Sequence, residues 1–411
     1  MKKLFLLIIL SGIVLSCDKK DDDLYGNYQI ARPLKVSLAE FKSEVDIIAP
    51  MPINESGKIY AYEDYIFVND KYRGIHIIDN ANPKIPKKIG FIKIVGNVDI
   101  SVKNDYLYAD SLMDLIVLDI SDIQNIKTIN RLENVLRDNV IWPLEADFVE
   151  YEDIDYSTEI LVGWETVTER RLKSEFEERG RGWGFAEFAN TADASVGQGG
   201  SLARFKIVDD YLYAVDSHNI NVFDISNLGD PVDLDDVYAG FDIETIFNRG
   251  QHLFLGSMRG MYIYDISSPA TPTFVSEFQH GTACDPVVVD DNYAYVTLRG
   301  GNGCGATESG LFIIDISDIT TPRLEKTYSM DEPYGLGIKD EKLFVCDGTS
   351  GLKVYDKSNI KKLRRLNHFK NIVTFDVIPT EDNLLMVGDG ILYQYRYRNN
   401  NINLISRLEL N

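Results

Sequence analysis

Hydrophobic and polar positions alternate along this chain in short blocks, without the 3.6-residue period of amphipathic helices. Runs rich in Val, Ile, Tyr and Leu end at Asp, Asn, Gly or Pro, as in VDISVK, YLYAD and LIVLDIS between Val98 and Ser121. Such runs are typical of short β-strands bounded by tight turns. The central runs are almost continuously apolar, which indicates sheets that are buried on both faces.

One phrase returns along the sequence: a β-rich run, an aspartate, and a turn rich in Ser, Asn and Pro. LIVLDISDI begins at Leu115, LFIIDISDITTP begins at Leu311, and a degraded copy, GILYQYRYRNN, begins at Gly390. Asp side chains can accept a hydrogen bond from the backbone amide two residues later and so fix a turn. We therefore interpret the repeated aspartates as structural, not catalytic or metal-binding. They are Asp79, Asp119, Asp224, Asp265, Asp315 and Asp356.

The repeats recur roughly every 40 residues, with four strands in each unit, which is the pattern of a β-propeller blade. Counting the degraded copy, the sequence predicts an all-β fold, a seven-bladed propeller over residues 53–411. One interval is much longer than the others. It predicts an insertion of about 133–200 between the second and third blades, with a strand at 160–164 and a polar helix at 168–179.

The first residues indicate export. Lys2 and Lys3 precede an apolar run at 4–15 that is too short to span a bilayer, so residues 1–16 form a predicted signal peptide. Val14-Leu15-Ser16-Cys17 matches the lipobox of bacterial lipoproteins and predicts lipidation of Cys17; the alternative is an ordinary signal peptide with an accidental cysteine. Residues 24–52 are expected to form an N-terminal arm against the ring, with a short helix capped by Ser37.

Residues 17–23 read CDKKDDD, and two compatible interpretations remain for this acidic segment. It is a solvated tether that keeps the folded body off the membrane. It also resembles the Lys/Asp-rich signal that sends some lipoproteins to the outer face of the outer membrane. We expect an outer-membrane lipoprotein. Under the second interpretation, it is also exposed at the cell surface.

The formal charge of −22 excludes several classes of partner. Nucleic acids and anionic lipid headgroups both require clustered Lys and Arg, so neither is expected to bind the body of the protein. Membrane attachment is expected through the lipid anchor alone. A protein, peptide, glycan or cation remains possible as a partner, and we expect a monomer.

The cysteines after Cys17 are assigned separate roles. Cys284 and Cys304 flank one strand pair, and an exported chain meets an oxidising compartment, so a disulfide between them is predicted. Cys346, in LFVCD, occupies a strand position that Ala109 fills in LYAD, and is expected to be a small buried apolar residue.

LIVLD and LFIID are close variants of the pentapeptide that names the LVIVD-repeat β-propeller lipoproteins, and the chain resembles this family over nearly all of its mature length. GIHIIDNANP, GGSLARF and HGTACDPVVVDDNYAYVTLRGGNGC are also similar to family sequences. The resemblance implies the propeller fold and export. It carries over no established enzymatic activity and therefore leaves function open.

A first candidate site lies at the channel mouth. Aligning the first strand of each unit on its aspartate places one residue about 20 positions upstream, where the innermost strands of a propeller line its channel. We expect these residues to surround the channel mouth and to hold a cation or a small polar ligand. The alternative is that the charges neutralise one another around trapped water. With Gly335 at the uncharged position, the candidates are Lys58, Asp99, Arg204, Glu244, Asp285 and Asp376, with His280 nearby.

The insertion offers a second candidate site, because all three tryptophans of the chain lie in it. Trp164, Arg181 and Trp183 would suit a sugar or an aromatic partner if their side chains were exposed. The alternative is that the tryptophans pack the insertion against the ring.

Catalytic motifs are missing from the sequence: it contains no HExxH, GxSxG, P-loop or CxxC. We therefore expect a non-enzymatic envelope scaffold that binds a ligand or partner protein, and we expect no cofactor beyond a possible cation. The alternative is a hydrolase or lyase acting on an envelope or dietary polymer through Asp285, Glu244 and His280. Paired carboxylates at an open pocket would favour that enzyme, and a closed, salt-bridged ring would favour the scaffold.

Overall fold

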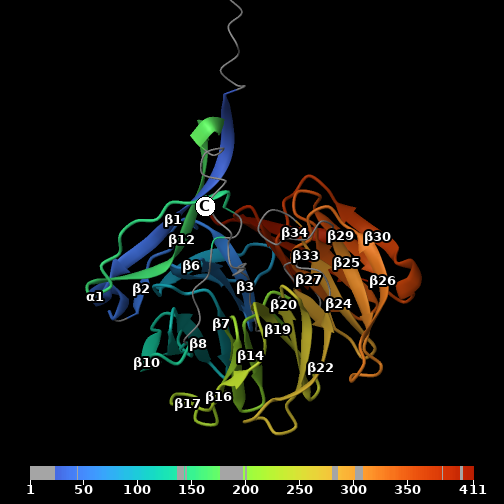
Figure 1. Ribbon diagram of the computed structural model, residues 1–411, viewed down its shortest axis with the longest axis horizontal. Coiled ribbons are helices and arrows are strands. Elements are labelled where there is room, and N and C mark those ends of the chain that lie inside the picture. The colour runs from blue at the N-terminus through green and yellow to red at the C-terminus, as the bar shows by residue number, and fades with distance from the viewer. Residues whose placement is uncertain are drawn as a thin grey trace, which may run out of the picture.

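The computed structural model describes residues 24–43, 45–136, 143, 146–175, 198–199, 201–279, 286–300, 309–381, 383–398 and 401–411. These residues form mainly β-strands, and the named helices are short: α1 (Leu38–Phe41) and the 3-10 helix η2 (Ile360–Lys362). Figure 1 shows the strands grouped into successive sheets.

Among the described residues, seven sheets of four or more antiparallel strands follow one another along the chain, and we number them one to seven. Sheet one contains β3 (Ser56–Tyr62), β4 (Tyr65–Asp70), β5 (Gly74–Asp79) and β6 (Lys87–Lys93), with β13 (Gln198–Gly199) and β2 (Asp46–Ile48) added at its edges. Sheet two contains β7 (Ile100–Lys103), β8 (Tyr106–Ser111), β9 (Asp114–Asp119) and β10 (Lys127–Leu132). Sheet three contains β14 (Phe205–Val208), β15 (Tyr211–Val215), β16 (Asn219–Asp224) and an outer strand in two pieces, β17 (Val232–Asp233) and β18 (Val237–Tyr238).

The four remaining sheets repeat the same antiparallel order. Sheet four contains β19 (Ile243–Arg249), β20 (His252–Ser257), β21 (Gly260–Asp265) and β22 (Thr273–Gln279). Sheet five contains β23 (Val287–Val289), β24 (Tyr293–Leu298), β25 (Gly310–Asp315) and β26 (Arg323–Ser329). Sheet six contains β27 (Leu336–Lys339), β28 (Lys342–Cys346), β29 (Leu352–Asp356) and β30 (Arg364–Phe369). Sheet seven contains β31 (Asp376–Pro379), β32 (Asn383–Gly388), β33 (Ile391–Arg398) and β34 (Asn401–Glu409).

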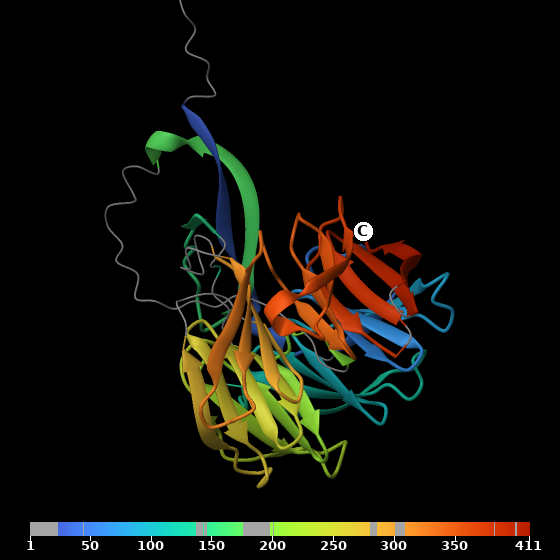
Figure 2. The ribbon, with the colours of Figure 1, turned by 90° about the vertical axis from the view of Figure 1, so that its right-hand side faces the viewer.

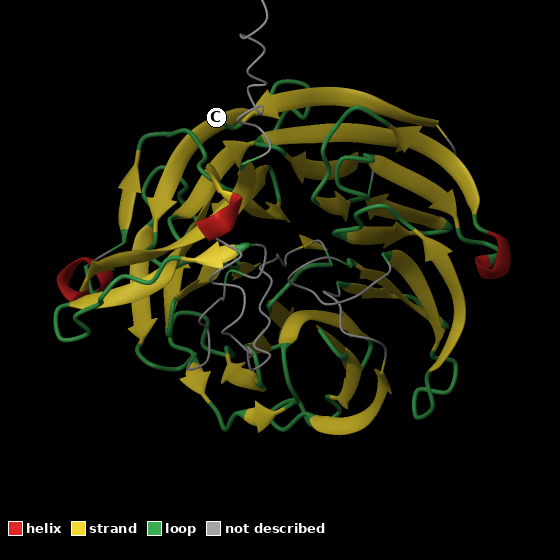
Figure 3. Cartoon of the chain, turned by 45° about the horizontal axis from the view of Figure 1, so that its top comes forward, coloured by secondary structure: helices red, strands yellow, loops and turns green. Residues whose placement is uncertain are grey.

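The first strands of these sheets surround a common axis. Neighbouring first strands contact one another in the order β3, β7, β14, β19, β23, β27 and β31, and β31 contacts β3 again. Figure 3 shows the sheets arranged around this axis. The all-β propeller expected from the repeat is therefore confirmed.

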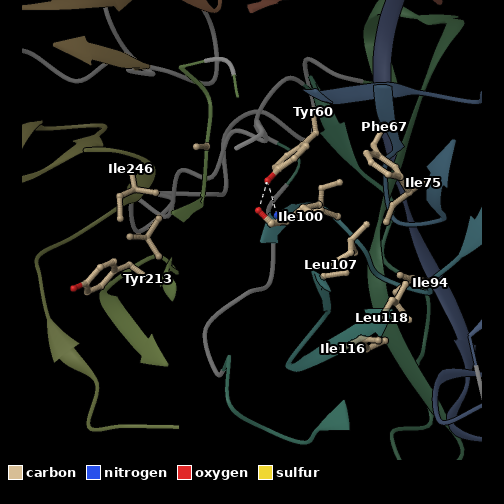
Figure 4. Close-up of a cluster of buried hydrophobic side chains, with 14 of the residues drawn as sticks. Tyr60, Phe67, Ile75, Ile94, Ile100, Leu107, Ile116, Leu118, Tyr213 and Ile246 are labelled. Carbon is tan, nitrogen blue, oxygen red and sulfur yellow. Dashed lines mark hydrogen bonds between the residues drawn. The ribbon is translucent and has the colours of Figure 1, made fainter. Parts of the chain in front are cut away.

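Hydrophobic side chains fill the space between adjacent sheets. Phe67 of sheet one, Leu107 of sheet two and Tyr213 of sheet three are each fully buried and belong to one cluster (Figure 4). The middle strands are buried at nearly every position, as in β8 and β9, because both faces of each sheet contact a neighbour. Burial on two faces explains the continuous apolar runs in the sequence.

The repeated aspartates close the third strand of each repeat in the way predicted. Asp119 Oδ1 accepts hydrogen bonds from the backbone nitrogen of Ser121 at 2.9 Å and from its hydroxyl at 2.6 Å. Equivalent backbone bonds join Asp79 to Ala81 and Asp315 to Ser317. The structural interpretation is confirmed for these aspartates.

The turns that follow these aspartates also connect one sheet to the next. In five places a hydroxyl of one sheet donates to a backbone carbonyl in the turn of the following sheet, at 2.6–2.9 Å. The pairs are Tyr108 with Leu228, Tyr213 with Pro269, Ser276 with Ile319, Tyr328 with Ile360, and Ser406 with Pro83. The last pair joins sheet seven to sheet one and therefore closes the ring.

A separate three-stranded sheet, which we call the ribbon, projects from the ring (Figures 1 and 2). It consists of β11 (Phe148–Val149), β1 (Tyr25–Ser37) and β12 (Glu159–Leu172), so that the N-terminal arm and the insertion form one structure. Ser37 caps α1 by accepting a hydrogen bond from the backbone nitrogen of Glu40, as predicted.

The helix predicted at 168–179 is wrong for residues 168–172, and of its described residues only 173–175 are helical. Residues 168–172 belong to strand β12, which pairs with β1 along its whole length, and the strand predicted at 160–164 belongs to the same element. The charges also pair across the ribbon: Arg32 contacts Glu169 at 2.7 Å, and Arg171 contacts Glu150 at 2.8 Å. One expected i,i+4 pair is present, with Arg171 and Glu175 3.8 Å apart. Pairing with a distant strand overrides the local helical pattern.

The ring has two faces. The ribbon face contains the loops between the second and third strands and the links between sheets; Gly163 of the ribbon contacts Tyr72 in one such loop. The opposite hairpin face contains the turns between first and second strands, such as Glu63 and Asp64, and the turns after the repeated aspartates.

Candidate binding site along the axis of the ring

The predicted channel-mouth residues that the structure describes all lie at the start of a first strand, toward the ribbon face. Each of them is buried, with no more than 6% of its surface exposed. His280 and Asp285 lie outside the described residues. The described residues are Lys58, Asp99, Arg204, Glu244 and Asp376.

Asp99 connects three sheets at this end of the axis. Its Oδ2 atom lies 3.2 Å from the ammonium of Lys58 in sheet one. The same oxygen accepts hydrogen bonds from the backbone nitrogens of Arg204 at 2.7 Å and Phe205 at 3.0 Å, at the start of sheet three. A buried carboxylate with this many donors is compensated within the protein. These contacts favour the alternative in which the channel-mouth charges neutralise one another.

Sequence reasoning missed a second set of buried aspartates, which end the second strand of a sheet. Asp110 Oδ1 accepts hydrogen bonds from the backbone nitrogens of Val98 at 2.7 Å and Asp99 at 2.9 Å, and burial raises the pKa of Asp110. Asp70 and Asp347 bind the link before their own sheet in the same way. The repeated strand endings YLYAD, YIFVND and LFVCD could have identified these aspartates from the sequence.

The chain itself passes along the axis after the insertion. Residues 198–199 of β13 pair with Tyr60 and Ala61 of β3, and β13 also contacts β31. The hydroxyl oxygen of Ser201 accepts a hydrogen bond of 2.8 Å from the backbone nitrogen of Leu336 in sheet six. This segment lies on the axis side of β3 and reaches sheets seven and six, so it occupies part of the channel.

The hairpin face carries a cavity with a volume of about 1080 Å³. It lies at the end of the axis among sheets one, two, three and seven. Carboxylates outnumber lysines in its wall, and tyrosines supply aromatic surface. The residues that carry its chemistry are Tyr60, Tyr62, Tyr65, Asp64, Lys103, Lys206, Asp209, Asp210 and Glu381.

The two lysines of the cavity differ in their surroundings. Lys103 donates to Asp210 Oδ1 at 2.7 Å and to the carbonyl of Asp209, which ties sheet two to sheet three. Lys206 lies 5.9 Å from the centre of the Phe247 ring, and burial lowers its pKa. The ammonium of Lys206 donates no hydrogen bond to any residue that the structure describes. It is the wall group best placed to bind a polar ligand group.

Two tyrosines hold the wall of the cavity rigid. The Tyr60 hydroxyl accepts from the backbone nitrogen of Val102 at 2.5 Å, a bond drawn in Figure 4, and burial raises the pKa of this phenol. The Tyr62 hydroxyl donates to Asp105 Oδ1 at 3.0 Å. Both bonds join sheet one to sheet two. From the sequence, we aligned the residues that begin each first strand. Aligning the residues that end each first strand would have found this end of the axis.

The structure corrects one of the three residues of the insertion site: the Trp164 side chain is not exposed. Trp164 is only 4% exposed and its ring packs edge-on against Tyr151, with the ring centres 6.2 Å apart. Its burial favours the packing alternative, because a buried ring offers no surface to a sugar. Arg181 and Trp183 lie outside the described residues.

Cysteine and metal chemistry add no site. Cys346 is buried with a free thiol, as expected, and burial raises its pKa well above the ordinary value. Cys17, Cys284 and Cys304 lie outside the described residues, so lipidation and the disulfide stay predictions. The described part of the chain contains no group of three or more His, Cys, Asp or Glu side chains that could hold a metal ion.

A family model described as the LVIVD repeat matches residues 55–90, 97–127, 199–234 and 280–330. These matches fall on sheets one, two, three and five, and each includes or adjoins a repeated aspartate. The chain therefore contains LVIVD repeats, which lie on the sheets of a β-propeller. A comparison with curated proteins gave no significant match.

Solved structures similar to this LVIVD-repeat protein support the fold. A protein from Lactobacillus plantarum matches with a TM-score of 0.53 and 11% identity, covering 86% of this chain and 96% of the other. The computationally designed protein Ika8 matches with a TM-score of 0.51 and 10% identity, covering 88% of this chain and 89% of the other. At such low identity the likeness extends to the fold alone.

Proposed function

We propose that this LVIVD-repeat protein is a non-enzymatic lipoprotein of the bacterial envelope, a seven-bladed scaffold that binds a partner in the cavity of its hairpin face. The cyclic order of the first strands and the closure from Ser406 to Pro83 support seven blades. The position of β11, β12 and β13 between sheets two and three in the chain supports an insertion there.

The cavity is the observation that carries the binding role. It combines a volume of about 1080 Å³, three tyrosines and a partly buried lysine on a rigid wall. Preformed hollows with a few convergent polar groups are the usual ligand sites of proteins. Because carboxylates outnumber lysines around it, and the whole chain carries a charge of −22, a cationic or neutral partner fits best.

The buried charges at the other end of the axis argue against the enzyme. Asp99 is bound by Lys58 and by two backbone amides, so it cannot serve as an open catalytic carboxylate. The lipobox and Cys17 support the anchor, which the described residues do not test. Among those residues, no helix is both long and apolar enough to cross a membrane.

Binding is tested by narrowing the cavity. Ala81 lines its rim in an exposed turn, and Ala81→Trp is expected to block the partner while the fold persists. Ala270→Trp, in the equivalent turn of sheet four, is the matched control. A photo-crosslinking amino acid at position 210 should attach the protein covalently to a partner in the bacterial envelope. This cross-linked product should form with the wild type and with Ala270→Trp, but not with Ala81→Trp. Identical products from all three would reject the cavity as the binding site.

Lipidation has its own test. Incorporation of labelled palmitate into the full chain should be complete for the wild type and absent for Cys17→Ala. Equal labelling of both chains would reject the anchor.

A further inference from the structure

The ribbon ends in a tip with the composition of a membrane-contacting surface. Leu24 is 53% exposed and immediately precedes β1. Tyr25 stacks against the guanidinium of Arg170, 4.9 Å from the ring centre, and the backbone nitrogen of Lys173 donates to the carbonyl of Leu24 at 2.9 Å. An aromatic ring beside Arg, Lys and an exposed Leu is typical of residues at the headgroup level of a bilayer.

The tip is also the point where the predicted anchor joins the fold. Cys17 lies seven residues before Leu24, and seven extended residues span at most about 25 Å. The lipid must therefore lie within about 25 Å of the tip. Figure 2 shows that β1 begins at the outer end of the ribbon.

The body of the protein gives a reason for such a spacer. The chain's charge of −22 is repelled by anionic headgroups, whereas the described tip presents Arg170 and Lys173, and its carboxylate Glu175 lies 3.8 Å from Arg171. The base of the ribbon is fixed, because Ile30, Ala31 and Trp164 are buried. Cross-strand ion pairs from Arg32 and Arg171 to Glu150 and Glu169 stiffen the ribbon from this base toward the tip.

We propose that the ribbon is a spacer whose tip rests on lipid headgroups, so that the ribbon face is turned toward the membrane and the hairpin-face cavity is turned away from it. This inference rests on the proposed anchor and specifies how it presents the cavity. The occupant of the tip is the lipid surface, and the partner of the cavity approaches from the side opposite the membrane.

The test measures the height of each face above a bilayer. The full lipidated chain is placed in vesicles of phosphatidylethanolamine and phosphatidylglycerol that contain acceptor-labelled lipid. A donor dye is attached through an unnatural amino acid at position 370 on the ribbon face or at position 341 on the hairpin face. Energy transfer should be stronger from position 370. Equal transfer, or stronger transfer from position 341, would overturn the orientation.

The spacer is tested by shortening it in register. Residues 26–29 pair with residues 168–171, so deleting both sets removes four pairs and about 13 Å. Transfer should rise from both positions. Unchanged transfer would overturn the spacer.

The tip is tested by substitution without shortening. Replacing Leu24 and Tyr25 by Ser, and Arg170 and Lys173 by Glu, should broaden the distribution of heights while the anchor keeps the chain on the vesicle. Lys84→Glu with Lys87→Glu, on the exposed hairpin face, is the charge control and should leave the heights unchanged. A tip variant with wild-type heights would remove the headgroup contact.

A second tether distinguishes the absence of lipidation at Cys17 from a wrong orientation. Residues 1–17 are replaced by a hexahistidine tag that binds nickel-chelating lipids at the same point of the chain. If Cys17 is not lipidated, the tagged chain still has to show the same order of heights. If the order is lost in the tagged chain, the orientation is wrong whatever the state of Cys17.

Discussion

At the scale of the residue, the most consequential side chains are aspartates that bind backbone amides. The repeated aspartates hold the turn after the third strand in sheets one to six, and Asp70, Asp110 and Asp347 hold the link before the first strand of their own sheets. A short acidic side chain suits both positions: Asp119 binds the amide and hydroxyl of Ser121, two residues later. Asp110 instead binds two successive amides, Val98 and Asp99, that lie 11–12 residues earlier in the sequence.

The turn aspartates predict a loss of stability in acid. Hydrogen bonds from the following serine hydroxyl, then from its backbone amide, lower the pKa of Asp119, Asp224, Asp265 and Asp315, and that of Asp356 to about 2. A carboxylate whose pKa is lowered by folding stabilises the protein above its ordinary pKa, near 3.9, and this contribution is lost as the pH falls toward 2. The urea midpoint should therefore fall between pH 5 and pH 2.

A serine variant isolates this effect. Changing Ser121, Ser267, Ser317 and Ser358 to Ala removes the hydroxyl donors and should make the acid dependence shallower. Ser43→Ala, which removes a hydroxyl outside these turns, is the control. An acid dependence as steep as that of the wild type would show that other carboxylates control it.

The buried pair at the axis gives a second prediction at this scale. Lys58→Met leaves the carboxylate of Asp99 without its cation, at a site where both side chains are almost fully buried. Losing one partner of a buried ion pair costs about 3–5 kcal/mol. Chemical denaturation should show a loss of this size, and Asp99→Asn should cost less because the amide oxygen still accepts from Arg204 and Phe205. A change below about 1 kcal/mol for Lys58→Met would contradict the buried pairing.

At the scale of the element, the ribbon shows how a long-range strand replaces a local preference. Residues 168–172 carry charges at helical spacing, yet they extend because β1 satisfies their backbone groups through antiparallel pairing. Trp164 packs against Tyr151 within the insertion, and the neighbouring Gly163 lies against Tyr72 of the ring.

Trp164→Ala should release the ribbon without unfolding the ring. Removing a buried Trp side chain costs about 3–5 kcal/mol of stability. Because the ribbon is a separate sheet, this loss should favour local opening of the ribbon over unfolding of the ring. Hydrogen exchange should accelerate in residues 25–37 and 159–172, with little change in β8 or β32. Equal acceleration throughout the chain would show that the ribbon and the ring form one cooperative unit.

At the scale of the whole molecule, stability depends on joining the last sheet to the first. The backbone nitrogen of Ile53 donates to the carbonyl of Leu410, and Leu410 is fully buried. Gln394 donates to Asn80 at 2.6 Å, and Ser406 donates to Pro83. The chain ends thus supply an interface equivalent to those between consecutive sheets.

Truncation after residue 398 should therefore open the ring. It removes β34 and Leu410 and exposes the apolar faces of sheets one and seven. We expect loss of the cooperative thermal transition, measured by circular dichroism, and rapid proteolysis of residues 53–90. Ser406→Ala should cost about 1 kcal/mol, similar to Ser276→Ala, since each removes one equivalent hydrogen bond. A truncated chain that melts like the full chain would show that closure is dispensable.

The sequence by itself determined the features that depend on neighbours along the chain: strand spacing, turn aspartates, the Ser37 cap and the LVIVD repeats. Each follows from residues within a few positions of one another, so local pattern was sufficient. The tertiary structure alone decided which ends of the strands meet. It neutralised Lys58 with Asp99, buried Trp164, and gathered Tyr62, Lys103 and Lys206 around a cavity. The sequence does not indicate that these residues of separate sheets lie close together, because only the closing of the ring brings them into contact.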